Sequence, residues 1–372
     1  LINGQWLDGS GAKRLAIVNP ATEETFAEVC SATADEIGQA AEVGQAAFES
    51  GWRDMPPGER TRLLRNLAKR IHENVETLAQ LETRNVGKPI GDARWEADAG
   101  AKVFDYYAGA IGHLCGQTIP VARGGFDFTL RQPMGVIAAI TPWNFPFLIA
   151  CWKVAPALAA GNSVVLKPAS LTPLTALMLG QLAQEAGLPD GVLQVVPGSG
   201  SEAGNALATH PLVRKIGFTG STEVGATIMK LAADDIKRVS LELGGKSPNI
   251  VFADADWQRA AAESPMSVFA NTGQDCCARS RMFIEQSIFD GFVDQFVAAT
   301  ESLKIGDPMD EATQVGPMVS AAQRELSESH IAGARDAGRE IRTGGDRPNG
   351  GGFYLNPAVV TGVETEDRAW RE

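Results

Sequence analysis

The sequence lacks any block of lysine or arginine and any long hydrophobic run. Its formal charge is −12, from 33 basic and 45 acidic residues, and this acidity disfavours nucleic acid and anionic membranes as partners. The longest apolar candidate, residues 146–160, is interrupted by Lys153 and is shorter than the ~20 residues of a membrane-spanning helix. No signal-peptide pattern stands at the start. We therefore predict no nucleic-acid partner and no membrane association.

Cysteine is scarce as well. The number of cysteines, five, is odd, and no C-x-x-C pattern occurs, so neither a disulfide framework nor a zinc site is expected. A reducing cytoplasm fits this usage best. None of the four histidines stands in a motif-like setting, which leaves a cysteine protease without its partner histidine. The cysteines are Cys30, Cys115, Cys151, Cys276 and Cys277.

The residues that are present predict an α/β protein. From Glu59 to Leu81 apolar residues recur three to four apart, which indicates one amphipathic helix. From Met134 to Pro248 short apolar runs alternate with helical segments, one of them beginning at Thr172 as N-cap. This alternation predicts a Rossmann-like parallel sheet that binds its ligand at the carboxyl ends of the strands. The expected strands are 136–140, 163–167, 193–196, 215–218 and 238–243.

Two further elements flank this region. After Pro248 the alternation resumes, with strands expected at 249–253 and 280–285 and helices around 257–271 and 286–303. That pattern predicts a second α/β domain. Before the sheet, the glycine-punctuated stretch 116–135 contains two short β-like runs, which we interpret as a hairpin.

The sharpest candidate for chemistry is the segment Asn271-Thr272-Gly273-Gln274-Asp275-Cys276-Cys277. A cysteine after a glycine-containing turn can be exposed near backbone N–H groups that lower its pKa. A buried structural cysteine is the usual alternative, and the polar lead-in argues against it here. By spacing alone, either sulfur qualifies as the nucleophile. Adjacent residues point in different directions, so we expect only one of them to face a substrate.

Three other features are candidates of lower specificity. Glu242 stands at a strand end beside glycines and is a candidate base, although a solvated strand-end carboxylate is the common case. Asn144 lies in a loop stiffened by two prolines, where its amide can donate to an oxyanion. The glycine-rich turns at 198–204 and 220–225 follow strands and precede helices, which favours an anion. The run Gly245-Lys246-Ser247 is not a P-loop, because position 240 is Ser240 instead of glycine.

Together these segments resemble the NAD(P)-dependent aldehyde dehydrogenase superfamily across nearly the whole length. Five matches in that family's order and approximate spacing are highly specific, whereas one alone is weak. An unrelated α/β dinucleotide-binding protein is the alternative that they disfavour. The matching segments are Thr-Pro-Trp-Asn-Phe-Pro at 141–146, Lys-Pro-Ala-Ser at 167–170, Phe-Thr-Gly-Ser-Thr-Glu-Val-Gly at 218–225, Leu-Glu-Leu-Gly-Gly-Lys-Ser-Pro at 241–248 and Phe-Ala-Asn-Thr-Gly-Gln-Asp-Cys at 269–276.

The resemblance implies a covalent mechanism for oxidising an aldehyde to a carboxylic acid. In this family the nucleophile is the cysteine two places after the glutamine, here Cys276. The asparagine of Pro-Trp-Asn, here Asn144, holds the oxyanion of the thiohemiacetal. The glutamate of Glu-Leu-Gly-Gly, here Glu242, activates the water that hydrolyses the thioester.

The resemblance also implies that NAD or NADP lies across the carboxyl end of the sheet. Lys167 and Ser170 are expected near the adenosine ribose, Gly220 and Ser221 near the pyrophosphate, and Trp143 near the nicotinamide end. The full expected cofactor set is Thr141, Pro142, Trp143, Lys167, Ala169, Ser170, Phe218, Gly220, Ser221, Val224, Leu243 and Gly244. No metal site is expected.

The domain organisation follows from the same resemblance. Residues 1–115 and 133–245 correspond to the cofactor-binding domain, 116–132 to an oligomerisation hairpin, and 246–372 to the catalytic domain. Subunits of this family are usually dimers or tetramers, so we expect a homo-oligomer.

Family members continue beyond the position of Glu372 and carry there a glutamate that binds the nicotinamide ribose. Either this sequence is part of a longer protein or the chain is truncated, and the start at Leu1 instead of Met favours the first alternative. The second functional hypothesis is a non-catalytic binding or structural protein on the same fold. Retention of Cys276, Glu242 and Asn144 argues against it, since a scaffold needs none of these side chains.

Overall fold

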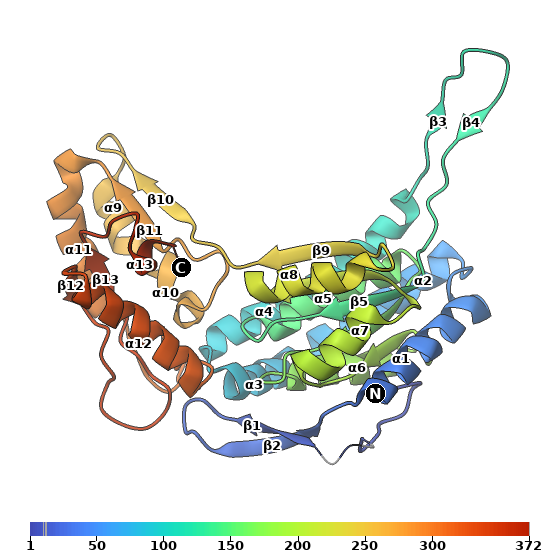
Figure 1. Cartoon of the computed structure of the whole chain (residues 1–372), viewed down its shortest axis with the longest axis horizontal. Coiled ribbons are helices and arrows are strands. Elements are labelled where there is room, and N and C mark those ends of the chain that lie inside the picture. Colours follow the sequence, from blue (N-terminus) through green and yellow to red (C-terminus); the bar gives the residue numbers. More distant parts are fainter. Residues whose placement is uncertain (10, 12, 372) are drawn as a thin grey trace. The chain divides into compact units, whose positions relative to one another are not determined.

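The computed structural model describes residues 1–9, 11 and 13–371 (Figure 1). The chain forms two compact units, each built from three separate stretches. Unit 1 contains Leu1–Ala16, Glu28–Ala79 and Arg94–Glu242, and unit 2 contains Ile17–Ala27, Gln80–Ala93 and Leu243–Glu372. No helix of the described residues is long and apolar enough to span a membrane.

Unit 1 is organised around one sheet in which the strands follow the order β7-β6-β5-β8-β9. The central strand β5 pairs in parallel with β6 on one side and with β8 on the other, and β7 continues in parallel from β6. All five residues of β5 and of β6 are buried, as expected of strands covered on both faces. The strands are β5 (Val136–Ile140), β6 (Ser163–Lys167), β7 (Leu193–Val195), β8 (Val213–Gly220) and β9 (Arg238–Leu243). The predicted α/β class and its parallel sheet are confirmed.

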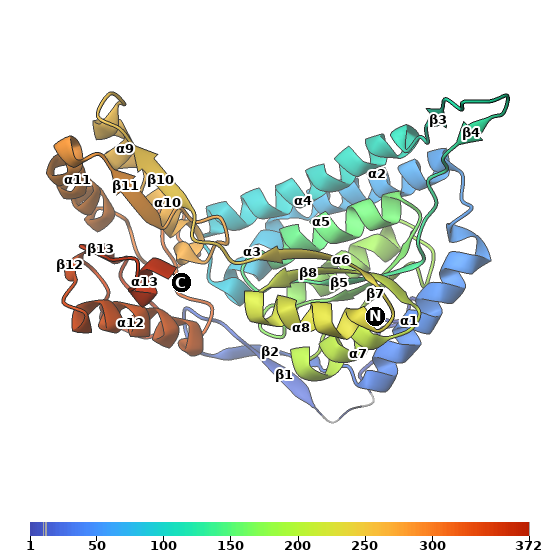
Figure 2. The same cartoon turned by 45° about the horizontal axis from the view of Figure 1, so that its top comes forward.

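Helices lie on both faces of this sheet, as Figure 2 shows. On one face α5 and α6 pack against the strands, with α2 against both helices. On the other face lie α1, α7 and α8. Their bounds are α1 (Ala34–Ala47), α2 (Pro57–Glu73), α5 (Pro146–Ala159), α6 (Leu174–Glu185), α7 (Asn205–Thr209) and α8 (Thr222–Ala233).

The remaining elements of the first half connect and extend this layered core. The strands β1 and β2 form a separate two-stranded sheet. Short helical turns η1, η2 and η3 join longer elements. Their bounds, with those of two further helices, are β1 (Arg14–Val18), β2 (Thr25–Cys30), η1 (Phe48–Trp52), α3 (Val75–Val86), α4 (Ile90–Ala110), η2 (Ile111–His113) and η3 (Gly200–Gly204).

The predicted helix over 59–81 is wrong in one respect, because the structure has two helices there, α2 and α3, separated by Asn74. The Asn74 side chain donates to the Arg70 carbonyl at 2.8 Å. In an uninterrupted helix the Asn74 backbone N–H would donate to this same Arg70 carbonyl. The backbone N–H turns instead to the Ile71 carbonyl at 3.0 Å, so competition from the side chain ends the helix.

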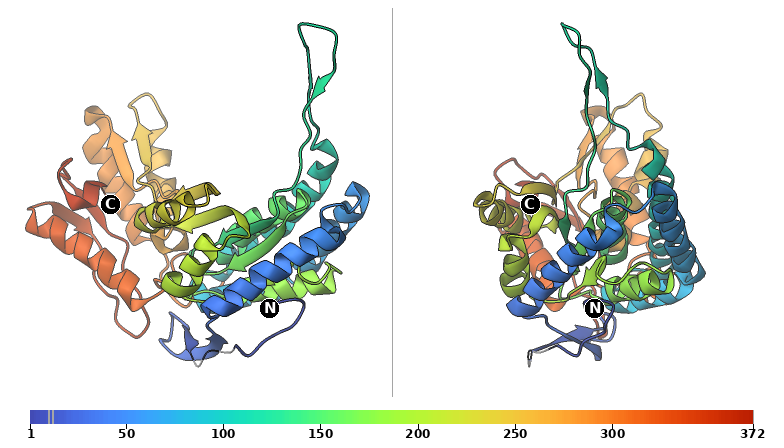
Figure 3. Two further views of the ribbon diagram at one scale, coloured as in Figure 1. Left: turned by 45° about the vertical axis from the view of Figure 1, so that its right-hand side comes forward. Right: turned by 90° about the vertical axis from the view of Figure 1, so that its right-hand side faces the viewer.

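The predicted hairpin is confirmed. Strands β3 (Thr118–Ile119) and β4 (Asp127–Phe128) pair antiparallel, and the arm that they form projects from the helices of unit 1 in both views of Figure 3. Its apolar side chains are exposed: Phe126 is 75% exposed, Phe128 52% and Leu130 71%.

Unit 2 contains a second parallel pair, β10 with β11, and an antiparallel pair, β12 with β13. Helices α9 and α10 connect β10 to β11, so the predicted strand–helix alternation after Pro248 is confirmed. The bounds are β10 (Pro248–Val251), α9 (Trp257–Glu263), α10 (Met266–Phe269), η4 (Ala270–Gly273), β11 (Arg281–Ile284), η5 (Gln286–Ile288), α11 (Phe289–Glu301), α12 (Ala321–Asp336), β12 (Glu340–Thr343), β13 (Val359–Thr361) and α13 (Arg368–Arg371).

The early stretches of unit 2 are fixed by contacts with residues far along the chain. The Ile90 N–H donates to the Pro308 carbonyl at 2.8 Å. A side-chain carbon at Gly87 would lie 2.8 Å from Pro317, which explains the absence of a side chain there. Lys88 and Glu82 form an ion pair at 3.4 Å in which both side chains are almost fully buried.

Candidate active site

The carboxyl ends of the parallel strands bring most of the expected cofactor residues to one edge of unit 1. The register pairs Ile140 with Lys167 on one side and with Phe218 on the other. The loops that follow these three residues therefore begin side by side. They contain Thr141, Pro142 and Trp143 after β5, Ala169 and Ser170 after β6, and Gly220, Ser221 and Val224 at the end of β8 and in the following turn. The chain also changes direction across the sheet between β5 and β8, where α/β sheets bind ligands.

Lys167 ties the loop after β6 to the loop after β7. Its ammonium group donates to the Pro168 and Gly198 carbonyls, both at 2.9 Å, and the Ser170 hydroxyl donates to the same Gly198 carbonyl at 3.0 Å. The lysine is 4% exposed, and this burial lowers its pKa to about 8. The loops after β6 and β7 are thus held by charge-assisted hydrogen bonds before any ligand arrives.

The end of β8 has the features of an anion-binding turn. Ser221 caps α8 by accepting a hydrogen bond from the Val224 N–H at 3.3 Å, which places the positive end of the helix dipole at this loop. A side-chain carbon at Gly220 would lie 2.6 Å from the Phe218 ring, so any larger residue here would have to displace that ring. Val224 is exposed in the first turn of α8.

Two buried threonine hydroxyls at this edge have no hydrogen-bond partner within the described residues, those of Thr141 and Thr219. They follow the register pair Ile140 and Phe218 on adjacent strands. Buried hydroxyls are normally satisfied, and a bound polar group at the strand ends would satisfy them. A dinucleotide therefore fits the residues that this edge presents.

The Asn144 loop is fixed at both ends. The Thr172 hydroxyl donates to the Trp143 carbonyl at 3.2 Å, so Thr172 does not act as the predicted N-cap; Pro173 takes that place instead. At the other end, the Glu96 carboxylate accepts the Leu148 N–H at 3.0 Å and caps the first turn of α5. Glu96 is 1% exposed. Sequence reasoning missed it because this contact spans 52 residues.

Glu242 is the penultimate residue of β9 and has an exposed side chain. Its charge acts on Lys153, a second residue that the sequence did not single out as functional. Burial lowers the pKa of Lys153 to about 8, while the Glu242 carboxylate acts in the opposite direction. The sequence did contain a sign of this, because Lys153 is the one charged residue in the otherwise apolar sequence of α5. Burying the Lys153 ammonium costs desolvation free energy, and the nearby Glu242 carboxylate offsets part of this cost.

In unit 2 the cysteine segment begins with three consecutive left-handed residues, Asn271, Thr272 and Gly273, with φ values of 49°, 61° and 72°. Such conformations cost energy for residues other than glycine. Gln274 compensates: its amide donates to the Asn271 carbonyl at 3.2 Å, and its carbonyl oxygen accepts the Val319 N–H at 2.9 Å. The Thr272 hydroxyl donates to the Gly316 carbonyl at 3.1 Å. The segment is therefore rigid.

Cys276 and Cys277 occupy the two central positions of a turn that the Ala278 N–H closes on the Asp275 carbonyl at 3.2 Å. Their sulfurs lie 3.7 Å apart. The expectation that the two side chains point in different directions is therefore wrong, because the turn brings both to one side. Cys276 is half-buried and Cys277 is exposed.

The Cys276 thiol is a poor acid in this arrangement. Burial, followed by the hydrogen bond and charge of Cys277 and the charge of Asp275, raises its pKa to about 12. Cys276 is consequently a neutral thiol at pH 7, contrary to the lowered pKa expected of a cysteine after such a turn.

The Glu-Leu-Gly-Gly segment approaches the cysteine turn within unit 2. A side-chain carbon at Gly245 would lie 3.0 Å from the Cys276 carbonyl, whereas the same addition at Gly244 meets nothing within 4 Å. Glycine at 245 thus allows the two backbones to come close. The structure brings Gly245 close to Cys276 in unit 2, with Leu243 and Gly244 preceding it, and places Asn144 and the strand-end loops in unit 1.

Comparison with known proteins decides the family. The model of the family described as "Aldehyde dehydrogenase family" matches residues 6–372. The chain belongs to the aldehyde dehydrogenase family. Betaine aldehyde dehydrogenase 1 of Oryza sativa is 43% identical over 381 residues, which cover 100% of this chain and 75% of the relative.

Two solved structures are similar over almost the whole chain. The NAD⁺ complex of aldehyde dehydrogenase from Bacillus cereus has a TM-score of 0.97 at 40% identity and matches 100% of this chain and 76% of its own. The Escherichia coli structure described as an NADP dependent enzyme has a TM-score of 0.97 at 39% identity, with 99% and 77% covered. The expected family, fold and reaction class, NAD(P)-dependent oxidation of an aldehyde, are confirmed for this aldehyde dehydrogenase.

The raised pKa predicts the pH dependence of Cys276 alkylation in the ligand-free protein. Only the thiolate reacts, and its fraction rises about tenfold per pH unit below the pKa. The iodoacetamide reaction at Cys276, followed by peptide mass spectrometry, should therefore accelerate from pH 7 to pH 10 without levelling off. Cys277→Ala, which removes one cause of the raised pKa, should react faster at each pH. A plateau below pH 9 would contradict this account.

Proposed function

We propose that this aldehyde dehydrogenase oxidises its substrate through a covalent intermediate on Cys276. The supporting observation is the rigid left-handed segment that ends in the Cys276 turn, since backbone strain of this kind is concentrated at functional sites. The Cys276 sulfur attacks the aldehyde carbon and forms a thiohemiacetal. Loss of hydride from that carbon leaves a thioester, and hydrolysis releases the carboxylic acid and restores the thiol.

Asn144 and Glu242 have separate roles in this proposal. The Asn144 amide and the Cys276 backbone N–H donate to the oxyanion of the thiohemiacetal. The fixed ends of the Asn144 loop, at Trp143 and Leu148, support a preorganised donor. Glu242 takes a proton from the water that attacks the thioester. Its exposed position at the end of β9 supports this role, because it is accessible to water.

The nicotinamide cofactor, NAD or NADP, supplies the hydride acceptor when bound. The strand-end loops of unit 1 would hold it: Lys167 and Ser170 at the adenosine ribose, and Gly220 with the Ser221 cap of α8 at the pyrophosphate. Trp143 and Leu243 would contact the nicotinamide end. We assign the remaining contacts to Thr141, Pro142, Ala169, Phe218, Val224 and Gly244.

The domain roles follow the same scheme. We assign cofactor binding to residues 1–115 and 133–245, apart from the stretches 17–27 and 80–93 that belong to unit 2, and the catalytic cysteine to 246–372. We also place the protein in the cytoplasm, a proposal supported by its five cysteines, which all lie in the described part of the chain and are all free thiols.

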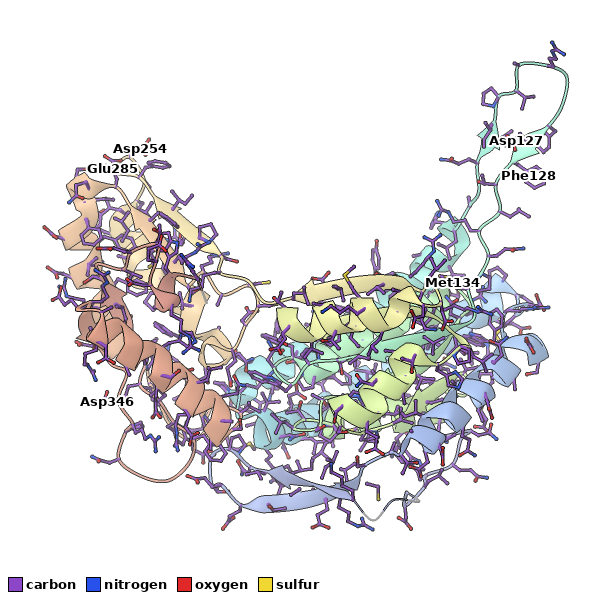
Figure 4. All side chains as sticks on the ribbon, viewed as in Figure 1. Asp127, Phe128, Met134, Asp254, Glu285 and Asp346 are labelled. Carbon is purple, nitrogen blue, oxygen red and sulfur yellow. The ribbon has the colours of Figure 1, made fainter. Side chains whose placement is uncertain are left out.

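We further propose that the β3–β4 hairpin binds a second copy of this chain. A two-stranded arm is marginally stable alone, and an exposed apolar edge favours pairing with another strand. The Phe126 and Phe128 rings lie 5.3 Å apart, and Figure 4 labels Phe128 on the arm. Their packing against a partner would remove this apolar surface from water.

The first prediction separates the two cysteines. Cys276→Ala should abolish aldehyde-dependent formation of NAD(P)H, measured by absorbance, because the proposal assigns attack on the aldehyde carbon to the Cys276 sulfur alone. Cys277→Ala should retain most of the activity. Betaine aldehyde, with aliphatic, aromatic, semialdehyde and ω-amino aldehydes, forms the substrate panel. Substantial turnover by Cys276→Ala would refute the nucleophile, and no activity of the unmodified protein with any aldehyde would favour the non-catalytic alternative.

The second prediction concerns Glu242. Because its role lies in hydrolysis of the thioester, Glu242→Gln should still form the thioester. A stopped-flow trace with micromolar enzyme should show at most about one NAD(P)H per active site, followed by very slow release. A full steady-state rate in this variant would show that another group activates the water.

The third prediction concerns cofactor choice at Ser170. An uncharged hydroxyl here tolerates a 2′-phosphate, so we expect measurable use of NADP. Ser170→Glu should lower kcat/KM for NADP at least about tenfold, equivalent to ~1.4 kcal/mol, by charge repulsion while sparing NAD. Ser170→Ala is the matched control and should keep its NADP activity. Unchanged NADP use in the glutamate variant would rule out this contact.

The fourth prediction tests the hairpin. Phe126→Ser combined with Leu130→Ser should lower the mass of the particle in sedimentation velocity, because the apolar surface of the arm is removed. Tyr106→Ser, which changes an aromatic residue that is 71% exposed on α4, is the control and should leave the mass unchanged. A monomeric unmodified protein would contradict the proposal.

A further inference from the structure

The cysteine turn brings three metal-ligating groups together on consecutive residues. One carboxylate oxygen of Asp275 and the sulfurs of Cys276 and Cys277 all lie within 4.8 Å of one another. Over the described ranges, this is the one cluster of three or more His, Cys, Asp or Glu residues with such spacing. The sequence predicted no metal site because it contains no C-x-x-C pattern.

The distance between the sulfurs fits a shared metal ion. Two thiolates bound to one tetrahedral Zn²⁺, each at about 2.3 Å, are separated by about 3.8 Å. The two sulfurs here lie 3.7 Å apart. A disulfide instead requires about 2.05 Å between sulfurs and Cα atoms at least about 4.4 Å apart, whereas adjacent Cα atoms are about 3.8 Å apart. The turn therefore suits a bridging ion better than an oxidised pair.

The ligand set is also held in place and accessible. The Asp275 carboxylate accepts the Cys277 N–H at 2.9 Å, and the Ala278 N–H closes the turn on the Asp275 carbonyl. Cys277 is exposed and Cys276 is half-buried, so an ion from solvent can reach both sulfurs. Thiolate ligands select soft or borderline cations such as Zn²⁺ and Cd²⁺ over Mg²⁺ and Ca²⁺.

We propose that Asp275, Cys276 and Cys277 form a binding site for a thiophilic divalent cation, and that an ion bound there stops aldehyde oxidation. Binding exchanges two thiol protons for one Zn²⁺, with no change in oxidation state: two S–H bonds break, two Zn–S bonds form and two protons are released. The inhibitory half rests on the proposed role of Cys276, whose sulfur electron pair is then committed to the metal.

Binding is measured first, without reference to activity. Titration of the reduced, metal-free full chain with Cd²⁺ should give a thiolate-to-metal charge-transfer band that saturates at one ion per chain, and Zn²⁺ should displace the Cd²⁺. Cys277→Ala and Cys277→Ser should each weaken binding at least tenfold, and Asp275→Asn should weaken it less. Cys115→Ala, at an exposed cysteine elsewhere, is the matched control and should bind like the unmodified chain. Absence of the band, or equally tight binding by both Cys277 variants, overturns the site.

Inhibition is measured second. Zn²⁺ should inhibit the unmodified enzyme, and a chelator should restore its activity. Cys277→Ala keeps the Cys276 nucleophile and should require at least tenfold more Zn²⁺ for half-inhibition. Equal sensitivity of this variant, or saturation with Cd²⁺ that leaves activity intact, overturns the inhibitory role. Turnover by Cys276→Ala would instead refute the proposed nucleophile, while the Cd²⁺ titration still decides the binding site.

Discussion

The arrangement of the expected cofactor residues at one edge of unit 1 depends on the hydrogen bonding of β5 to a parallel strand on each side. It aligns Ile140 with Lys167 and with Phe218, so the loops after three strands begin at one level. The buried Lys167 ammonium then joins the loop after β6 to the loop after β7. A slip of one residue in either pairing would move every side chain of β5 to the opposite face of the sheet and put these loops out of line with one another. The positions of the candidate cofactor residues are thus a consequence of strand register.

The two candidate centres are stabilised in different ways. The strand-end loops are fixed by the buried ammonium group of Lys167, whose pKa burial lowers to about 8. The cysteine segment is fixed by Gln274, whose amide holds a strained backbone from both sides. The Cys276 thiol in this segment remains protonated at neutral pH because its pKa is raised. Since the thiolate is the reactive form, this protects the half-buried sulfur from adventitious oxidation. In the proposed mechanism, attack on a substrate then requires the Cys276 thiol to lose its proton in the occupied site.

Local patterns predicted the sheet well and the contacts between distant residues poorly. The strands Val136–Ile140, Ser163–Lys167 and Arg238–Leu243 match the expected bounds. The first two are mostly apolar and fully buried, and the third alternates polar and apolar residues, which are both strand patterns. The break at Asn74 was missed because its cause is a side-chain hydrogen bond that periodicity does not encode. Glu96 and Lys153 were missed because their importance arises from partners or burial that only the fold provides. The convergence of the two sulfurs required the turn geometry of Asp275–Ala278.

The interleaving of the two units has a consequence for synthesis on the ribosome. Residues Ile17–Ala27 and Gln80–Ala93 belong to the unit completed by Leu243–Glu372. Even the later of the two leaves the ribosome roughly 150 residues before that last stretch begins, which at about 5–20 residues per second is roughly 8–30 s, and the earlier one precedes it by roughly 215 residues. During this interval Ile17, Val86 and Ile90, which are at most 2% exposed in the finished protein, have not met their late partners. These early segments of the nascent chain therefore expose apolar side chains until the last stretch is made. A chaperone that binds apolar stretches would be expected to bind them.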